Sequence, residues 1–482
     1  MAVSTPPVKS SPSMAFDLAD VAADISYDGL PAHVIAEGKR VLLDSIGCTV
    51  AGLAHDKGRV GVELGRRLGG AAEATILGTG ERVSMPAAAF ANGELMNAHD
   101  FDAIHRPPGH IVPYVIPGVL AAAESAGVTG KDLIVATVLA HEIAGRLSIA
   151  MPFKKVTTDA AGNEVITYSN LTGAGQCAFG TTVAMGGLLG YDRVQLANAI
   201  GLTGHVSNVP TGTKFAAVEG GAWSKYGAAG WISSNAVTAT LAAGLGFVGD
   251  TTVFEGEHGW WRMVGAQGWD PADVMTGLGT TWTTIEEIAY KLYPACYNVH
   301  SSLDALIGII DGHGLRPEDI GEVRVFMDPQ VERKPYLQTS ELTPLAAQFM
   351  MTYCAAVAVH RIPPGAAWQD VSTLADPGVR AFMDKVTVRA HPGYEAAYRA
   401  DRRSSLARVE VVAGGRTFTE ERMYPGGTPF TDARATDEQL DAKFLHNVSR
   451  VLTEDQAARA LAALRALEQV TDVRDVVALL NP

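Results

Sequence analysis

The sequence predicts a mainly α protein, with a large all-helical domain joined to a smaller α+β domain. Apolar residues recur every three or four positions from Phe16 to about Gly249, which is the spacing of a helix face. After about residue 280, short runs of alternating apolar residues appear, which is typical of strands. We therefore expect an all-α domain over 1–280, completed by 432–482, and an α+β domain over 281–431 that forms a lid.

Length and composition narrow the class of protein. The chain has 482 residues, of which 47% are hydrophobic and 19% are charged, so it can bury the cores of two globular domains. The formal net charge of -14 argues against a nucleic-acid partner, which requires a basic face. An anionic ligand would therefore need a local cationic pocket.

The sequence also predicts a cytoplasmic protein without a membrane partner. Its four cysteines lie far apart and form no CxxC pair, which indicates neither a zinc knuckle nor a disulfide framework and fits a reducing compartment. Residues 1–16 are polar and proline-rich, and we interpret them as a frayed tail rather than a signal peptide. The longest apolar stretch, 111–123, is too short to cross a bilayer.

Capping patterns predict the ends of individual helices. Thr129 with Asp132 marks a helix start before an apolar run, and Thr453 with Gln456 forms a capping box near the C-terminus. Glycine-containing breaks separate the helical segments. Strand signals are nearly absent before about residue 249.

Three runs of alternating apolar residues predict the strands of the α+β domain. Their apolar positions are Val323, Val325 and Met327, then Val386 and Val388, then Val409 and Val411. The last run meets 416–421 across Gly414 and Gly415, which predicts a hairpin. Helices are expected at 301–310 and after Thr343, where a cap is followed by a proline.

The stretch NAHDFDAIHRPPGHIV, residues 97–112, concentrates groups that bind metals or move protons. The possible ligands are His99, Asp100, Asp102, His105 and His110. Two prolines break any helix after His105, so paired helical histidine ligands are not maintained, and we expect no metal. A histidine beside a carboxylate suits proton transfer. A polar loop that only caps helix ends is the alternative interpretation.

Other candidate residues are ambiguous when each is taken alone. Lys291 precedes a Tyr-Pro turn, and Cys296 and His300 follow at the mouth of a helix, where a helix N-terminus and a lysine favour anion binding. Lys214 lies in a glycine-bounded loop, and Tyr353 lies on an apolar helix. Taken alone, Lys291 would ordinarily be a surface lysine and Tyr353 a core tyrosine, and Lys214 stays ambiguous.

Taken in order, these segments resemble the MmgE/PrpD family, whose members include dehydratases, decarboxylases and an epimerase. The resemblance rests on LLDSIGCTVAG, AAAFANGELMNAHDFD, the Lys214 loop, EGEHGWW, KLYPACYNVHSSLDA and AAQFMMTY. Their shared order and spacing are more specific than any one motif. The resemblance implies a cofactor-independent enzyme that has a helical domain and an α+β lid and is usually a homodimer.

The resemblance also implies roles for individual residues. His110 would remove or deliver a proton, with its tautomer held by Asp100. Lys214 and Lys291 would receive substrate carboxylates and stabilise a carbanion-like state, and Tyr353 would donate to a leaving hydroxyl or a carboxylate. The expected substrate-binding residues are His105, Asn170, Cys296 and His300.

The sequence departs from the family pattern at three places. Ile104 replaces a threonine of the decarboxylase relatives, Cys296 replaces a second histidine of several members, and a family histidine near Asn170 is missing.

From the resemblance and the matched residues, we expect a lyase that acts on a small di- or tricarboxylate. It would act by proton abstraction alpha to a carboxylate with loss of water, or by loss of carbon dioxide. An epimerase with the same base, a non-catalytic carboxylate-binding protein and a metal-dependent hydrolase are the alternatives.

Overall fold

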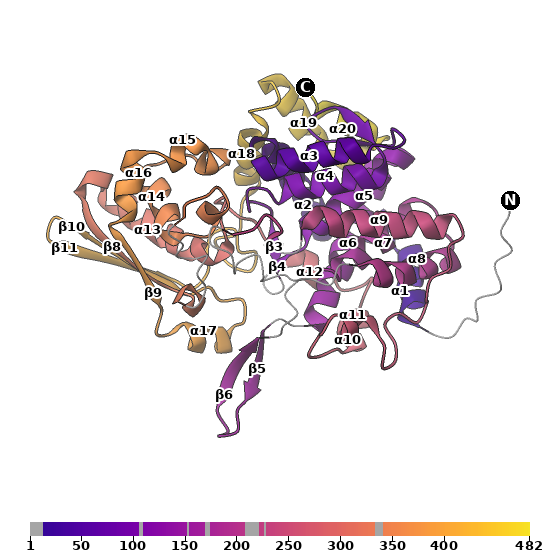
Figure 1. Cartoon of the computed structure of the whole chain (residues 1–482), viewed down its shortest axis with the longest axis horizontal. Coiled ribbons are helices and arrows are strands. Elements are labelled where there is room, and N and C mark those ends of the chain that lie inside the picture. Colours follow the sequence, from indigo (N-terminus) through magenta and orange to yellow (C-terminus); the bar gives the residue numbers. More distant parts are fainter. Residues whose placement is uncertain are drawn as a thin grey trace.

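The computed structural model describes residues 13–105, 109–151, 154–168, 174–207, 221–225, 228–332 and 341–482. These residues form a mainly α protein with small sheets, which confirms the predicted fold class. Figure 1 shows a large helical body beside a smaller part in which helices lie against a sheet.

The helical body contains the first two hundred and eighty or so residues together with the C-terminus. Its helices are α1 (Met14–Asp24), α2 (Ala32–Ala51), α3 (Asp56–Leu68), α4 (Met85–Met96), α5 (Val112–Ala126), α6 (Gly130–Ala150), α7 (Cys177–Leu188), α8 (Arg193–Val206), α9 (Ala229–Gly244), α10 (Trp260–Met263), α11 (Pro271–Met275), α12 (Thr283–Glu286), α18 (Asp437–Val448), α19 (Glu454–Arg465) and α20 (Val473–Leu479). The last three pack on α2 and α5 (Figure 1), and their apolar residues share one core with those helices. The exact domain limits stay a prediction, since Trp282, Ile285 and Ile288 also lie in this core.

Small residues let the helices of the body approach closely. At the contact between α4 and α9, a Cβ on Gly93 would lie 2.9 Å from the Gly230 backbone. The Gly230 amide donates to Glu94 Oε1 at 2.8 Å in the same contact. This packing holds the start of α9 near the C-terminal end of α4.

The α+β part is built on a four-stranded sheet in the order β11-β10-β8-β9. Its strands are β8 (Ile320–Met327), β9 (Val386–Ala390), β10 (Ala407–Ala413) and β11 (Arg416–Arg422). The helices of this part are α13 (His300–His313), α14 (Met351–Val359), α15 (Val371–Leu374), α16 (Pro377–Met383) and α17 (Tyr394–Ala400). All the apolar strand positions named above are buried in a second core, and the predicted hairpin is confirmed as β10–β11.

The strand content of the helical body is higher than the sequence predicts. Short pairs form between β1 (Ala74–Ile76) and β2 (Glu81–Val83) and between β5 (Lys154–Thr158) and β6 (Glu164–Tyr168), and the latter pair projects from the body in Figure 1. A third small sheet has the order β4-β3-β7, from β3 (Ile104–His105), β4 (Gly109–His110) and β7 (Ile288–Ala289). Two- to five-residue strands are too short for a periodic signal.

Predicted helix starts are confirmed where a capping box is present. Thr129 with Asp132 and Thr453 with Gln456 both form complete capping boxes. The helix expected after Thr343 begins later, because Thr343 caps a 3-10 turn, Ala346–Gln348, ahead of α14. Helix α6 is long and apolar enough to cross a membrane, but 89% of its most apolar window is buried inside the protein, as in a core helix.

Candidate active site

A short irregular segment after α4 carries the central carboxylates. Asp100 is fully buried and has a φ of 54°, a left-handed conformation that aspartate tolerates better than most residues. Pairing of β3 with β7 places Ile104 opposite Ala289, and this brings Lys291 close to Asp100. Lys443 of α18 then donates to the carbonyl oxygens of Phe101 at 2.7 Å and Lys291 at 3.0 Å, which ties the two segments together.

Two buried lysines contact the same oxygen of Asp100. The Nζ atoms of Lys291 and Lys225 lie 3.0 and 3.1 Å from Asp100 Oδ1. Lys291 also donates to the Asp100 carbonyl at 2.8 Å. Both ammonium groups are buried, so water screens their interaction with neighbouring charges less than it would at the protein surface.

His110 lies between two carboxylates. Its Nδ1 is 2.5 Å from Asp102 Oδ2, and its Nε2 is 3.2 Å from Asp100 Oδ1. We expected Asp100 alone to hold the tautomer, but Asp102 makes the shorter contact and is itself oriented by the Asn97 side chain at 3.1 Å. Both ring nitrogens of His110 therefore face carboxylate oxygens.

The surroundings shift the pKa values of Asp100 and Lys225 to below their ordinary values. Burial raises the pKa of Asp100, but Lys225, Lys291 and the His110 ring outweigh it and hold that pKa well below its usual value. Burial lowers the pKa of Lys225 to about 8, although Asp100 opposes the shift. Lys225 therefore titrates closer to neutrality than an ordinary lysine.

Lys225 is a site residue that the sequence interpretation missed. It lies in SKYGAAG, just before α9, and its position ahead of a helix among small residues is the only local signal. Lys214, to which the family role was assigned, lies outside the described residues, as does Asn170. Among the residues that the structure does describe, Lys225 and Lys291 supply the two ammonium groups expected beside His110.

Cys296 and His300 line the same neighbourhood but are not set up as reactive groups. Burial, with the Asp100 charge, raises the pKa of the Cys296 thiol, although Lys291 opposes this shift. Burial and the Lys291 charge lower the pKa of His300 to about 3, and its Nε2 lies 3.1 Å from the Ala295 carbonyl. A neutral imidazole that donates to a carbonyl supports the local backbone.

The remaining predicted positions contact residues other than Asp100. The Tyr353 hydroxyl donates to the Trp368 carbonyl inside the second core. His105 is buried, and its Nε2 is 3.6 Å from Glu287 Oε2. Ile104, in place of the family threonine, packs in a small apolar cluster with Ala289 and Tyr297, so the local environment suits its apolar side chain.

The donor set is poorly suited to a metal ion. Asp100, Asp102 and His110 form the one group with ligand-like spacing among the described residues. The ammonium groups of Lys225 and Lys291 already lie 3.1 and 3.0 Å from Asp100 Oδ1. A metal cation bound to the same carboxylate would be repelled by both of them, because like charges repel strongly at low dielectric. The alternative ligand His99 instead contacts Gln369 Oε1 and the Ala51 carbonyl.

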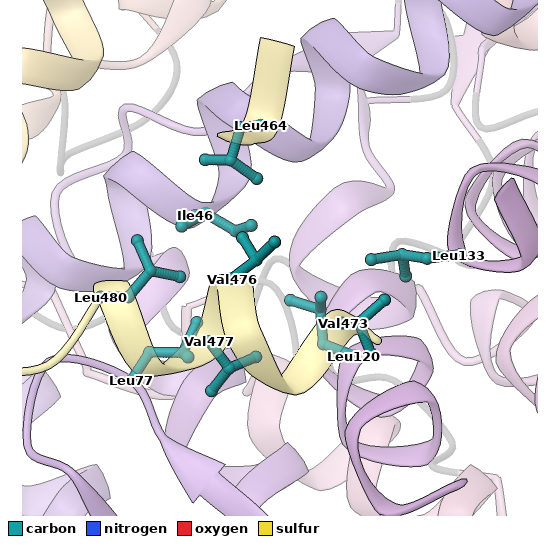
Figure 2. Close-up of a pocket in the computed structure, with 9 residues that line it drawn as sticks. All are labelled: Ile46, Leu77, Leu120, Leu133, Leu464, Val473, Val476, Val477 and Leu480. Atoms are coloured by element: carbon teal, nitrogen blue, oxygen red, sulfur yellow. The ribbon is translucent and has the colours of Figure 1, made fainter. Parts of the chain in front are cut away.

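A pocket in the helical body has a different character. Figure 2 shows nine aliphatic side chains around it, drawn from α2, α5, α6, α19, α20 and the loop after β1. The lining residues are Ile46, Leu77, Leu120, Leu133, Leu464, Val473, Val476, Val477 and Leu480. With no polar side chain among them, this pocket cannot orient an anion.

Two models of one protein family match most of this chain. The MmgE/PrpD N-terminal domain matches residues 16–271, and the MmgE/PrpD C-terminal domain matches residues 293–469. The chain belongs to the MmgE/PrpD family. The C-terminal match extends into α18 and α19, although both helices pack in the core of the helical body.

Relatives with a named activity are distant in sequence. The cis-aconitate decarboxylase of Aspergillus terreus is 24% identical over 297 residues, which covers 59% of this chain and 58% of that enzyme. The cis-aconitate decarboxylase-like protein oryM of Aspergillus oryzae is 23% identical over 96% of both chains. Human cis-aconitate decarboxylase is 23% identical over 94% of this chain and 91% of its own. Family and relatives together support the prediction of a lyase.

Proposed function

We propose that this protein is a lyase of small di- or tricarboxylates, and that loss of carbon dioxide is its reaction. The observation that carries the proposal is the buried contact of Lys225 and Lys291 with Asp100, beside a histidine held by two carboxylates. This cluster gathers two ammonium groups and a proton carrier in a chain whose net charge is -14. Such local positive charge is what a polycarboxylate requires.

The arrangement supplies what decarboxylation demands. When the bond to the departing carboxylate breaks, carbon dioxide leaves and the electron pair stays on the substrate carbon, delocalised toward a neighbouring carboxylate. Ammonium groups already in place stabilise that developing charge without reorganisation. His110 then delivers a proton to a carbon of the delocalised carbanion and regains one from solvent, so that the product has gained one proton and lost one carbon dioxide.

The direction of proton transfer separates decarboxylation from base-initiated reactions. Decarboxylation needs His110 to deliver a proton to the carbanion, whereas dehydration and epimerisation both begin with a base that removes one. The names of the relatives point to the same reaction, with cis-aconitate as the first substrate to test. Dehydration and epimerisation are the alternative reactions. That the protein is a homodimer stays a prediction of the family resemblance, and that it is cytoplasmic stays a prediction of the sequence.

A direct test is turnover of a panel of polycarboxylates, with cis-aconitate first, in deuterated water. We expect the product to have lost carbon dioxide and to carry one deuterium on a carbon that was part of the delocalised carbanion, as read by proton NMR. A new alkene with all carboxylates retained would instead identify a dehydratase. Exchange with inversion at one carbon would identify an epimerase, and tight binding without turnover would favour a non-catalytic binding protein.

A further inference from the structure

Gln348 connects the α+β part to the lysine of the helical body. It ends the 3-10 turn Ala346–Gln348 and is fully buried. Its side-chain oxygen accepts a hydrogen bond from Lys225 Nζ at 2.9 Å. Its side-chain nitrogen donates to the Ala98 carbonyl at 2.7 Å, two residues before Asp100. One side chain therefore contacts both segments that meet at the carboxylate.

The orientation of this amide is determined by its neighbours. Gln348 Nε2 also donates to Gln369 Oε1 at 3.1 Å. Gln369 Nε2 in turn donates to the carbonyl oxygens of His99 and Pro294, both at 3.0 Å. Because each amide nitrogen faces carbonyl oxygens, a flip of Gln348 would turn its NH₂ group toward the Lys225 ammonium. The oxygen must therefore face Lys225.

We propose that Gln348 is a positioning residue that holds the Lys225 ammonium against Asp100 and so makes the lysine's position depend on the docked α+β part. A neutral acceptor directs the ammonium without cancelling its charge, which stays available for a substrate carboxylate. The inference rests on the proposed function for its kinetic consequences, whereas the geometry it asserts can be tested without turnover.

Two matched variants separate positioning from general stability. Gln348→Met keeps the length of the side chain and removes its hydrogen bonds. Gln369→Met removes a comparable set of buried contacts, among them one of the two hydrogen bonds from Gln348 Nε2, but it leaves the bonds of Gln348 to Lys225 and to the Ala98 carbonyl in place. We expect kcat/KM to fall about 10- to 100-fold in Gln348→Met, the loss typical of a hydrogen bond to a charged group, and less than 3-fold in Gln369→Met. Equal losses in the two variants would overturn the proposal.

The pH dependence of kcat/KM supplies a readout that a merely structural role would not move. Lys225 has a pKa of about 8, so activity that needs its charge declines as the pH rises through that value. We expect the alkaline limb to move to lower pH in Gln348→Met and to higher pH in Gln348→Glu, where a carboxylate stabilises the ammonium. The other titratable groups that act on Lys225 are Asp100, Asp102, Lys57, Lys291, His55, His99 and Cys296. Neither variant changes any of these groups. If the alkaline limb of the kcat/KM profile stays at the wild-type pH in both variants, the proposal is contradicted.

Crystal structures of the wild type and Gln348→Met distinguish this proposal from the proposed function. Displacement of Lys225 Nζ away from Asp100 in the variant is the expected result. A lysine that remains at its wild-type position would overturn the positioning role, whatever the activity. Absence of turnover by the wild type on every polycarboxylate would overturn the proposed function alone, because the position of Lys225 is read directly from the two structures.

Discussion

Two buried carboxylates of the helical body, Glu142 and Asp100, have very different contacts. Glu142 accepts from Arg146 Nε at 2.7 Å with one oxygen, and from the Thr284 backbone and hydroxyl and the Ile285 amide with the other. Asp100 instead has three cationic side chains within 3.2 Å of a single oxygen. The first carboxylate is saturated by a balanced set of donors, and the second lies among crowded positive groups.

The contrast indicates which of the two is structural. Arg146 completes its own bonding with carbonyls of Val274, Thr276 and Thr281, so the Glu142 pair is neutral and closed. Around Asp100, two ammonium groups and the His110 ring share a single carboxylate oxygen. Buried charges are costly unless they are paired. A substrate carboxylate would add a further anion beside the two lysines.

The strongest test of this contrast is removal of the Asp100 charge. Asparagine tolerates the same left-handed backbone, so Asp100→Asn should fold while leaving His110 and both lysines without their shared partner. We expect kcat to fall about 10²- to 10⁴-fold, the usual range for a displaced acid or base. Steady-state kinetics on the substrate found by the panel measures it, and retention of most of the wild-type kcat would refute the role of Asp100.

The matched change at the structural carboxylate should act on stability. Glu142→Gln leaves Arg146 buried without its counter-charge, and breaking such a pair costs about 3 to 5 kcal/mol of unfolding free energy. Urea denaturation measures this loss. We expect kcat per folded molecule to be unchanged, and a large drop in kcat would show that the Glu142 pair also serves the site.

Lys225 should give the active cluster a characteristic pH signature. Its pKa is lowered from 10.5 to about 8 in the folded protein, mainly by burial. Below pH of about 8 the lysine is charged in both the folded and unfolded states, and folding bears the full cost of burying it. Between about 8 and 10.5 the folded protein loses the proton first, so the unfolding free energy rises with pH, by on the order of 3 kcal/mol.

Lys225→Met removes that rise and serves as its control. The difference in unfolding free energy between wild type and variant, followed by urea denaturation from pH 7 to pH 10.5, should therefore change across this window. A difference that stays constant with pH would mean that Lys225 keeps an ordinary pKa in the folded protein.

The smallest effect is expected at the apolar pocket, which lies outside the charged cluster. Val477→Ile adds one methyl group to the lining shown in Figure 2. Filling apolar space should raise the unfolding free energy by about 0.5 to 1 kcal/mol without altering kcat. A lower urea midpoint would show that neighbouring side chains already fill the space.

Local patterns in the sequence determine much of this protein. Helical spacing, the two capping boxes and the alternating valines of the four-stranded sheet predict the fold class, because each depends on residues close together in the chain. Local motifs also bring Asp100, His110 and Lys291 forward as candidates for proton transfer and anion binding, but it is the family resemblance that assigns them roles.

Only the tertiary structure decides which groups meet. Asp102, rather than Asp100, makes the shorter contact with His110, because the antiparallel pairing of β3 with β4 places the histidine beside that carboxylate. Lys225 reaches Asp100 through the close packing of α9 on α4, a contact between residues more than a hundred positions apart. Local periodicity carries no information on such pairs, since it is packing between distant segments that brings their side chains together.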